Sequence, residues 1–254
     1  MMRYLLYNLV LYIVAPLVLA YLYFSPKYRT LMLRFSPPVS EFKDSPLWVH
    51  ACSVGEVNVA KVLIAAFRKN TPECPVVLSV STLSGYNLAK TLSIDSTVSF
   101  APFDLKSSVC GFLKKINPCG LVIIETELWP NMIRETSRIG VPVLIANGRI
   151  SDKRFPRYMK YKSVMPAFYR HLDLVAVQNS CYADRFCRLG VDKGKIVITG
   201  NLKNDAVVTT VSEVASTAFR IENGFSEKDI LLVFASTRPG AEHPAQSGGN
   251  PGRQ

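Results

Sequence analysis

The stretch LWVHACSVGEVNVAKVLIAAF, residues 47 to 67, passes from an apolar run through a turn of small residues into a helical pattern. An apolar strand at 47–51 that leads in this way into a helix at 57–69 is typical of the first part of a parallel βαβ unit. The turn between them also carries a glutamate, Glu56, whose presence needs an explanation.

The same alternation of apolar runs and helical patterns continues along the chain to residue 205. Further strands are predicted at 76–80, 97–103, 121–125, 141–147, 174–178 and 195–200. Further helices are predicted at 85–92, 105–116, 130–139, 155–171 and 180–189. Strands that are apolar throughout and separated by helices indicate an open parallel sheet with helices on both faces. We therefore predict an α/β, Rossmann-like domain over residues 47–205, which binds ligands outside the carboxyl ends of its strands.

An apolar segment precedes this domain. Residues 4–24 form a run of 21 positions without a charge, and a helix needs about 20 to cross a bilayer. We predict a single-pass membrane anchor at 1–26 and a joint at 27–46, while a membrane-surface helix and a cleaved signal remain alternatives. Basic residues are more numerous after the span than before it, which places the bulk of the protein on the cytoplasmic side of the membrane.

The chain carries 30 Lys and Arg against 19 Asp and Glu, a formal net charge of +11. Such a charge suits nucleic acid, anionic lipid or a phosphorylated substrate, and it also suits a plain solvated surface. The sequence shows no zinc finger, helix-turn-helix signature or RNA-binding aromatic motif. Together with the apolar segment, the charge therefore favours an anionic membrane as partner and disfavours nucleic acid.

The six cysteines include no CxxC pair. They are predicted to be buried free thiols in a reducing compartment rather than disulfides. The three histidines lack the spacing of metal ligands, and neither a G-x-S-x-G nor a P-loop motif occurs. We therefore expect no metal and no nucleophilic triad.

The pattern changes beyond residue 205. A helical linker is predicted at 206–229 and one apolar strand at 230–237. The remainder, 238–254, is rich in Pro, Gly, Gln and Ser and is predicted to be a disordered tail, because it cannot bury enough apolar surface to fold. The arrangement indicates a second domain interrupted after its first strand, as in a fragment, a frame-shifted product or a short form.

The turn after the first strand has two interpretations. Ser53 and Glu56 fit the S-x-x-E capping box, in which the glutamate stabilises a helix start. Alternatively, Gly55 lets a substrate approach the backbone, and Glu56 acts as general base on a hydroxyl group.

The motif that follows the strand at 121–125 contains Glu125, Glu127 and Trp129. Two carboxylates two residues apart project to the same side if the strand continues, where they orient a sugar or tune each other's ionisation. They also suit the start of a helix, where the dipole favours acids. Trp129 is either a packing residue or a platform for a sugar ring.

A hydroxyl-rich turn follows the second strand. Ser81, Thr82 and Gly85 offer hydroxyl and backbone N–H contacts to a substrate, although such turns are common.

Two further polar turns follow later strands. Asn147 and Arg149 come at the end of the strand at 141–147, and Lys203 follows the last strand of the domain. Arg149 suits a phosphate or carboxylate partner or a surface salt bridge, and the turn around Lys203 is either a substrate contact or an ordinary polar turn.

Taken in order behind the apolar segment, the motifs HACSVGE, STLSG, ETELWPN, NGRIS and GNLKND resemble those of the 3-deoxy-D-manno-octulosonic acid (Kdo) transferases of lipopolysaccharide synthesis. The resemblance covers roughly residues 40 to 237, and ETELWPN is its most distinctive motif. It implies a membrane-anchored, two-domain GT-B glycosyltransferase that inverts configuration without a bound metal or other cofactor. The donor would be CMP-Kdo and the acceptor the phosphorylated lipid A precursor at the inner membrane.

The resemblance also implies roles for particular residues. The catalytic glutamate of the SVGE motif falls on Glu56, and the acidic pair of ETELWP falls on Glu125 and Glu127. The amino-terminal domain of such enzymes mainly receives the acceptor and the carboxyl-terminal domain the nucleotide. The segment after residue 237 departs from the family pattern, and nearly all of the donor domain is absent. This chain is therefore expected to be a fragment with little activity alone. A non-catalytic membrane module that binds lipid A precursor or a partner subunit is the alternative function.

Overall fold

The computed structural model describes residues 2–205, 213–226 and 229. The chain divides into two compact units, residues 1–207 and 208–254. In the second unit, the described residues include one helix, α10 (Glu213–Glu222). The predicted strand at 230–237 and tail at 238–254 lie outside the described residues, as does part of the predicted linker.

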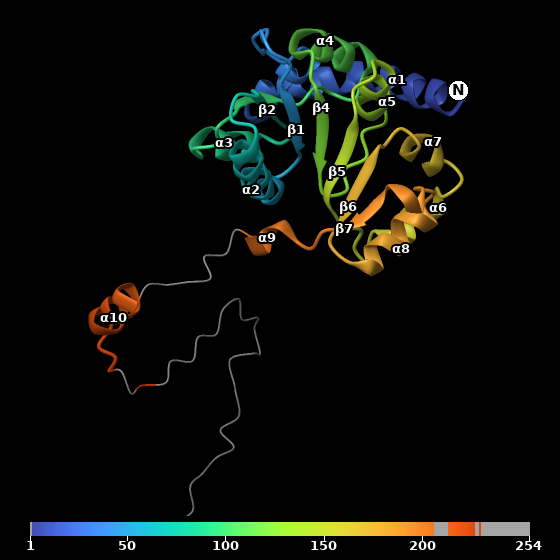
Figure 1. Ribbon diagram of the computed structural model, residues 1–254. Coiled ribbons are helices and arrows are strands. Elements are labelled where there is room, and N and C mark those ends of the chain that lie inside the picture. The colour runs from blue at the N-terminus through green and yellow to red at the C-terminus, as the bar shows by residue number, and fades with distance from the viewer. Residues whose placement is uncertain (1, 206–212, 227–228, 230–254) are drawn as a thin grey trace, which may run out of the picture. The chain divides into compact units, whose positions relative to one another are not determined.

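The first unit contains a seven-stranded parallel sheet in the order β3-β2-β1-β4-β5-β6-β7 (Figure 1). The strands are β1 (Leu47–Ala51), β2 (Val76–Val80), β3 (Thr97–Phe100), β4 (Gly120–Ile124), β5 (Val143–Gly148), β6 (Leu174–Val177) and β7 (Ile196–Ile198). All seven strands predicted within residues 47–205 are present, and the α/β, Rossmann-like fold is confirmed. The sheet runs outward in both directions from β1, which makes the end of β1 the point where the strand order reverses.

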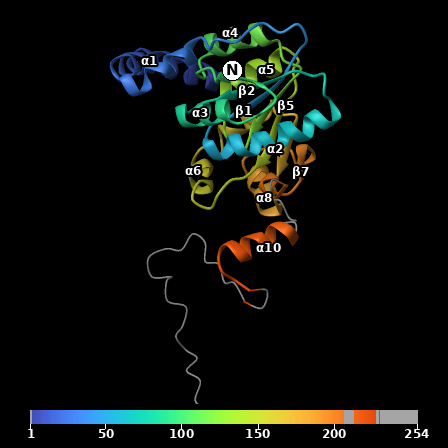
Figure 2. The same ribbon diagram turned by 90° about the vertical axis from the view of Figure 1, so that its left-hand side faces the viewer.

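Helices connect the strands and cover the sheet. They are α2 (Val54–Asn70), α3 (Leu83–Thr91), α4 (Lys106–Ile116), α5 (Pro130–Arg138), α6 (Phe155–Lys160), α7 (Met165–Tyr169), α8 (Ser180–Arg188) and α9 (Leu202–Asp205), with a 3-10 turn at Lys193–Lys195. Successive residues of β1 face opposite sides of the sheet. Trp48 packs with α4, α5 and α7 on one face, whereas Val49 packs with α2 and α3 on the other. Figures 1 and 2 show these two helical layers.

The predicted helix at 155–171 is wrong in its length, because two short helices occupy this segment. Pro156 and Pro166 each lie in the first turn of one of them. The ring of Pro166 would collide with the carbonyl of Lys162 in a continuous helix, and Pro166 has no N–H to donate. The chain therefore ends α6 and begins α7 after a turn.

The cysteine prediction is correct in chemical state and wrong in burial. All six cysteines are free, but Cys119 and Cys181 are exposed and the other four are half-buried. Cys119 lies at the end of the loop before β4, and Cys181 lies in the first turn of α8, so neither is in the core.

Two helical segments precede the sheet. The first is α1 (Met2–Phe24), with a mean hydropathy of 2.1, which makes it a candidate membrane span by length and composition. The second is the 3-10 helix η1 (Pro26–Phe35), which runs back to the domain and buries Arg34. Most large side chains of α1 are exposed, and the less exposed ones lie on one side of the helix.

Candidate active site

The sequence motifs meet at one edge of the sheet. SVGE follows β1, STLSG follows β2, ETELWPN follows β4, NGRIS begins in β5, and GNLKND follows β7. Because all strands are parallel, these five turns lie at the shared carboxyl edge. The predicted location of the site is therefore consistent with the fold.

Glu56 lies in the third position of α2, and its carboxylate is held by the turn before it. Ser53 caps the helix through a hydrogen bond from the Glu56 N–H to Ser53 Oγ (3.4 Å). In return, the Ser53 hydroxyl donates to Glu56 Oε1 (2.9 Å), and the Cys52 N–H donates to Oε2 (2.7 Å). The capping interpretation is thus confirmed. The carboxylate accepts from the N–H of Cys52, one residue before the N-cap, whereas in the usual capping box it accepts from the N–H of the N-cap itself.

The environment of Glu56 also changes its ionisation. Its residue is only 6% exposed, and burial raises the pKa of its carboxyl from 4.5 to about 7. The two hydrogen bonds oppose this shift, while the negative charges of Glu127 and Glu125 add to it. A carboxylate with a pKa near neutrality is suited to accept a proton from a substrate hydroxyl. Helix capping and base chemistry are therefore compatible in this residue.

The turn after β2 packs directly on the turn after β1. Thr82 caps α3 by accepting from the Gly85 N–H (3.3 Å), and its hydroxyl donates to the Cys52 carbonyl (2.9 Å). A Cβ at Gly85 would lie 2.9 Å from Thr82 Oγ1 and 3.3 Å from the Ser53 carbonyl carbon. Glycine is thus required here for the close approach of α3. Gly55 is different, since a Cβ there would meet only Ser53 Oγ at 3.9 Å, an ordinary contact.

Glu125 stands at the centre of a charged cluster after β4. Its backbone is left-handed (φ 62°) and the strand ends before it, so the condition under which strand geometry would place Glu125 and Glu127 on the same side is not met. Its carboxylate pairs with Arg149 Nε at 2.9 Å and with Lys203 Nζ at 3.5 Å. Three motifs that are far apart in the sequence therefore meet at one carboxylate.

Further hydrogen bonds fix these loops to one another. The Thr126 hydroxyl accepts from the Arg149 N–H (3.0 Å) and donates to the Arg149 carbonyl. Asn147, also left-handed (φ 58°) and buried, accepts at Oδ1 from the Leu202 N–H (3.1 Å). Among the described residues, its amide Nδ2 has no hydrogen-bond partner. Left-handed backbone at two non-glycine residues is typical of functional turns held by their surroundings.

Glu127 and Trp129 extend the site toward the joint. Glu127 Oε1 lies 3.8 Å from Arg154 Nη1, and burial raises the pKa of its carboxyl. Trp129 packs edge-on against His50, with ring centroids 5.6 Å apart, and contacts the core. These contacts show Trp129 as a packing residue, and its role as a sugar platform stays a prediction.

The residue Arg34 was not singled out from the sequence, although it contacts a predicted site residue. It is 8% exposed and donates to the Ala101 carbonyl (3.0 Å) and to Ser81 Oγ (3.4 Å). With Lys27, Tyr28, Leu31 and the turn at 81–84, it lines a groove of about 540 Å³. The only sequence signal was an isolated arginine in the apolar pattern LMLRF.

In the described part of the chain, no group of three or more His, Cys, Asp or Glu is placed to hold a metal ion. The expectation of a reaction without a bound metal or other cofactor stays a prediction.

The fold and the site together define a class. A parallel Rossmann-like sheet with carboxylates and cations at its carboxyl edge is an α/β ligand-binding domain, as expected for one half of a GT-B protein. Residues 28–206 match the model of a family described as 3-deoxy-D-manno-octulosonic-acid transferase (kdotransferase). The chain belongs to this Kdo transferase family.

Individual relatives agree with this assignment. The chain is 33% identical to a bifunctional glycosyltransferase/methyltransferase of Fusobacterium nucleatum over 82% of its own length and 33% of the relative's. It is 29% identical to a 3-deoxy-D-manno-octulosonic acid transferase of Haemophilus influenzae, covering 93% of this chain and 57% of the relative. For the enzyme of that name from Chlamydia trachomatis, the values are 27%, 90% and 54%. The chain thus spans a third to somewhat over half of the length of these relatives.

Among solved structures, the UDP-GlcNAc 2-epimerase of Neisseria meningitidis bound to UDP-GlcNAc is similar in fold. The TM-score is 0.50 at 10% identity, and the match covers 72% of this chain and 55% of that one. At this identity the similarity concerns the fold alone.

Proposed function

We propose that this chain supplies the acceptor-binding half and the general base of a Kdo transferase. The observation that carries the proposal is the position of Glu56, a buried carboxylate with a pKa near 7 at the end of β1, where the strand order reverses, in a chain of this family. The proposed donor is CMP-Kdo and the proposed acceptor is a phosphorylated lipid A precursor. The proposed location is the cytoplasmic side of the inner membrane.

The proposed reaction is a single displacement. The Glu56 carboxylate takes the proton of an acceptor hydroxyl, whose oxygen attacks the anomeric carbon of Kdo. The bond from that carbon to the phosphate oxygen of CMP breaks, and CMP leaves with the electron pair. Attack from the face opposite the leaving group inverts the configuration. Removing the proton as the new bond forms is general-base catalysis.

The remaining site residues are proposed to hold the acceptor. Ser81 and Thr82 offer hydroxyl groups, and Arg34 and Lys27 bring positive charge to the same groove. Arg149 and Lys203 place two further cations beside Glu125. Cations and hydroxyl groups together are suited to the phosphates of an anionic acceptor.

The division of the chain follows from this proposal. We retain an anchor at 1–26, a joint at 27–46, an acceptor-binding domain at 47–205, a linker at 206–229, and the start of a donor-binding domain at 230–237. The nucleotide would be bound by residues beyond this start, as the sequence resemblance implies.

The test uses the complete enzyme, in which a donor-binding domain follows residue 237, in vesicles that contain lipid A precursor and CMP-Kdo. The mass of the acceptor is measured for the wild type, for Glu56→Gln, and for Glu73→Gln, a control at an exposed glutamate. We expect transfer by the wild type and the control, and loss of transfer with retained acceptor binding in Glu56→Gln. Transfer by Glu56→Gln would refute the base role. Acceptor binding without transfer by the wild type would instead support the non-catalytic module.

A further inference from the structure

The helix α1 is in contact with the Rossmann-like domain and η1 along one side. Its less exposed residues recur every three or four positions, at Tyr4, Tyr7, Leu11, Ala15, Val18 and Leu22. This spacing is that of one face of a helix. The N-terminal end of α1 lies near α5 in both ribbon views (Figures 1 and 2).

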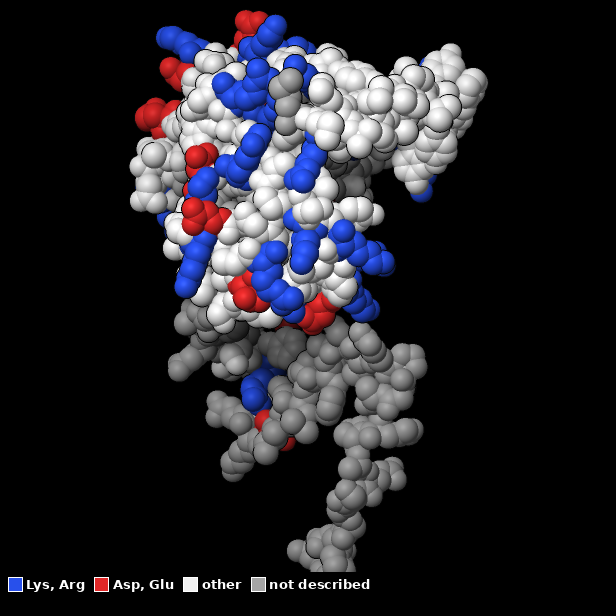
Figure 3. Space-filling view, turned by 90° about the vertical axis from the view of Figure 1, so that its right-hand side faces the viewer, with Lys and Arg blue, Asp and Glu red and all other residues white. Residues whose placement is uncertain are grey.

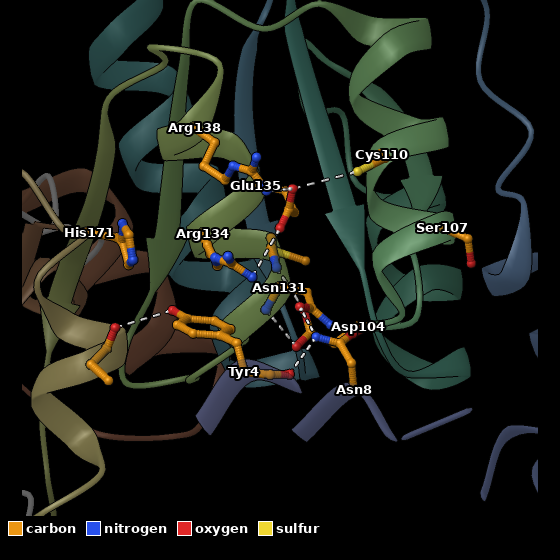
Figure 4. Close-up of polar contacts among 12 residues, drawn as sticks. Tyr4, Asn8, Asp104, Ser107, Cys110, Asn131, Arg134, Glu135, Arg138 and His171 are labelled. Atoms are coloured by element: carbon orange, nitrogen blue, oxygen red, sulfur yellow. Dashed lines mark hydrogen bonds and ion pairs between the residues drawn. The ribbon is translucent and has the colours of Figure 1, made fainter. Parts of the chain in front are cut away.

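The contacts at that end are polar and specific. Asn8 and Asn131 exchange side-chain hydrogen bonds, from Asn8 Nδ2 to Asn131 Oδ1 (3.1 Å) and from Asn131 Nδ2 to Asn8 Oδ1 (2.8 Å). Figure 4 shows this pair facing each other beside Asp104. The Tyr7 hydroxyl donates to Asp104 Oδ2 at 2.7 Å. A reciprocal amide pair and a hydrogen bond to a carboxylate fix both the position and the rotation of the helix.

Aromatic packing completes the interface. Tyr4 is 2% exposed and packs edge-on against Phe168, with ring centroids 5.0 Å apart. The Arg134 guanidinium lies over the Tyr4 ring at 4.3 Å, and the Tyr4 hydroxyl donates to the Ala167 carbonyl (3.3 Å). The side of α1 that carries Tyr4, Tyr7 and Asn8 is therefore covered by the domain and is not available to lipid.

The opposite side of α1 is exposed and apolar. Leu5, Leu9, Ile13 and Leu17 are between 57% and 71% exposed. A helix that lies on a membrane normally has one polar face turned to water. In α1 that face is covered by protein, which explains why the helix is apolar on all sides without having to cross the bilayer.

The two modes of membrane contact place the N-terminus differently. A crossing helix with the domain on the cytoplasmic side carries residues 4 to 8 to the far face of the bilayer. The structure instead holds these residues against Asp104, Asn131 and Arg134 of the domain. Drawing those groups into hydrocarbon would be costly, because they are polar or charged.

We propose that α1 is an in-plane helix, docked on the domain through Tyr4, Tyr7 and Asn8, whose outer face enters one leaflet of an anionic bilayer. Both ends of the helix then lie on the domain's side of the membrane. Lys27 and Arg29 follow the helix directly and supply charge that is complementary to anionic headgroups. Figure 3 shows a mostly white projection beside a face on which Lys and Arg side chains outnumber Asp and Glu. The inference does not depend on the transferase proposal.

Topology provides the decisive test. A short uncharged epitope with a protease site is added before Met1 of the full chain, and protease is applied to inverted inner-membrane vesicles and to spheroplasts. We expect cleavage in the inverted vesicles and protection in spheroplasts, as for the domain itself. Cleavage from the outside of spheroplasts would show a crossing helix and overturn the proposal, as would recovery of the chain in the soluble fraction.

A second experiment tests the docking contacts and the lipid. Asn8→Ala, Asn131→Ala and the double variant are compared by thermal unfolding of the full chain, with the exposed Asn58→Ala as control. We expect Asn8→Ala to lower the midpoint on the order of 2–4 °C, the double variant to lose less than the sum of the two, and the control to stay unchanged. Additive losses would refute the docked pair. Binding to vesicles of anionic lipid should exceed binding to zwitterionic vesicles and fall with salt, and equal binding to both would refute the choice of an anionic leaflet.

Discussion

The carboxylate of Glu56 accepts a hydrogen bond from the Cys52 backbone N–H at 2.7 Å. The first turn of α2 is therefore tied to the residue that directly follows β1. The same carboxylate is buried and lies near the charges of Glu125 and Glu127. Glutamine keeps one acceptor oxygen for the backbone N–H of the capping contact but cannot act as a base, which separates the two functions experimentally.

The first prediction concerns stability and pH. The carboxyl of Glu56 keeps its proton up to about pH 7 in the folded protein and up to about pH 4.5 when unfolded. The folded state thus binds more protons between these values, and the free energy of unfolding falls as pH rises through this window. Glu56→Gln lacks this loss. Between pH 4.5 and pH 8, the free energy of unfolding of Glu56→Gln minus that of the wild type should therefore increase by up to about 3 kcal/mol, as measured by urea unfolding.

The control for this prediction is internal. The carboxyl of Asp104, whose pKa burial raises from 3.8 to about 6, contributes to both proteins and cancels in their difference. A difference that does not change with pH would show that the ionisation of Glu56 is not shifted in the folded state.

The second prediction concerns the pH dependence of transfer. The proposed base must be ionised, so the rate should rise as pH increases through about 7. The measurement is kcat/KM, from initial rates at acceptor concentrations well below saturation, between pH 5.5 and 8.5. A rate that is flat across this range would argue against Glu56 as the proton acceptor.

The third prediction concerns Glu125, which holds Arg149 and Lys203. Glu125→Gln removes the charge that orients both cations. Because the two cationic side chains are about half exposed, the free energy of unfolding should change by less than about 1 kcal/mol. Transfer should nevertheless fall by roughly tenfold or more, through lost orientation. Equal losses in Glu125→Gln and in the exposed control Glu73→Gln would contradict a role for Glu125 in the site.

The fourth prediction concerns Gly85. A Cβ there would lie 2.9 Å from both Thr82 Oγ1 and Val80 Cγ1, in a site with backbone on its third side. Gly85→Ala should therefore destabilise the protein by about 1–3 kcal/mol. The matched control is Gly111→Ala in α4, where a Cβ would meet nothing within 4 Å of the described atoms. That variant should gain up to about 1 kcal/mol from helix propensity, so similar values for the two variants would refute the packing argument.

The fifth prediction concerns Asp104, which caps α5 from outside the helix. Its carboxylate accepts from the Asn131 N–H (3.0 Å) and the Met132 N–H (2.8 Å), in addition to the Tyr7 hydroxyl. An asparagine offers one acceptor in place of two. Asp104→Asn should cost about 1–3 kcal/mol of unfolding free energy, measured at pH 8, where the wild-type carboxyl is ionised. A neutral effect would show that solvent replaces the lost bonds.

The periodicity of the sequence was sufficient to predict the strands and the edge where the motifs meet. Apolar runs such as VVLSV at 76–80 are fully buried in the structure, and their alternation with helices determines a parallel sheet. The length predicted for the helix at 155–171 was wrong because of Pro166. A proline is tolerated in the first turn of a helix but breaks its interior, and the periodicity alone did not show that a second helix begins at Met165.

The remaining features of the site depend on contacts between distant segments. The left-handed backbone of Glu125 is stabilised by its surroundings, because local preference disfavours it for a glutamate. Arg34 reaches Ser81 across 47 positions of sequence. The length and hydropathy of α1 do not distinguish a crossing helix from one that is covered by protein on one side and by lipid on the other.

The strand order has a consequence for how such a protein can vary. Glu56 follows β1, which has two strands on one side and four on the other. Changes in β3 reach β1 only through β2, whereas β7 also leads into the turn that brings Lys203 to Glu125. Sequence drift is therefore better tolerated at the β3 margin of the sheet than at the β7 margin, where it also disturbs the turns that surround the base.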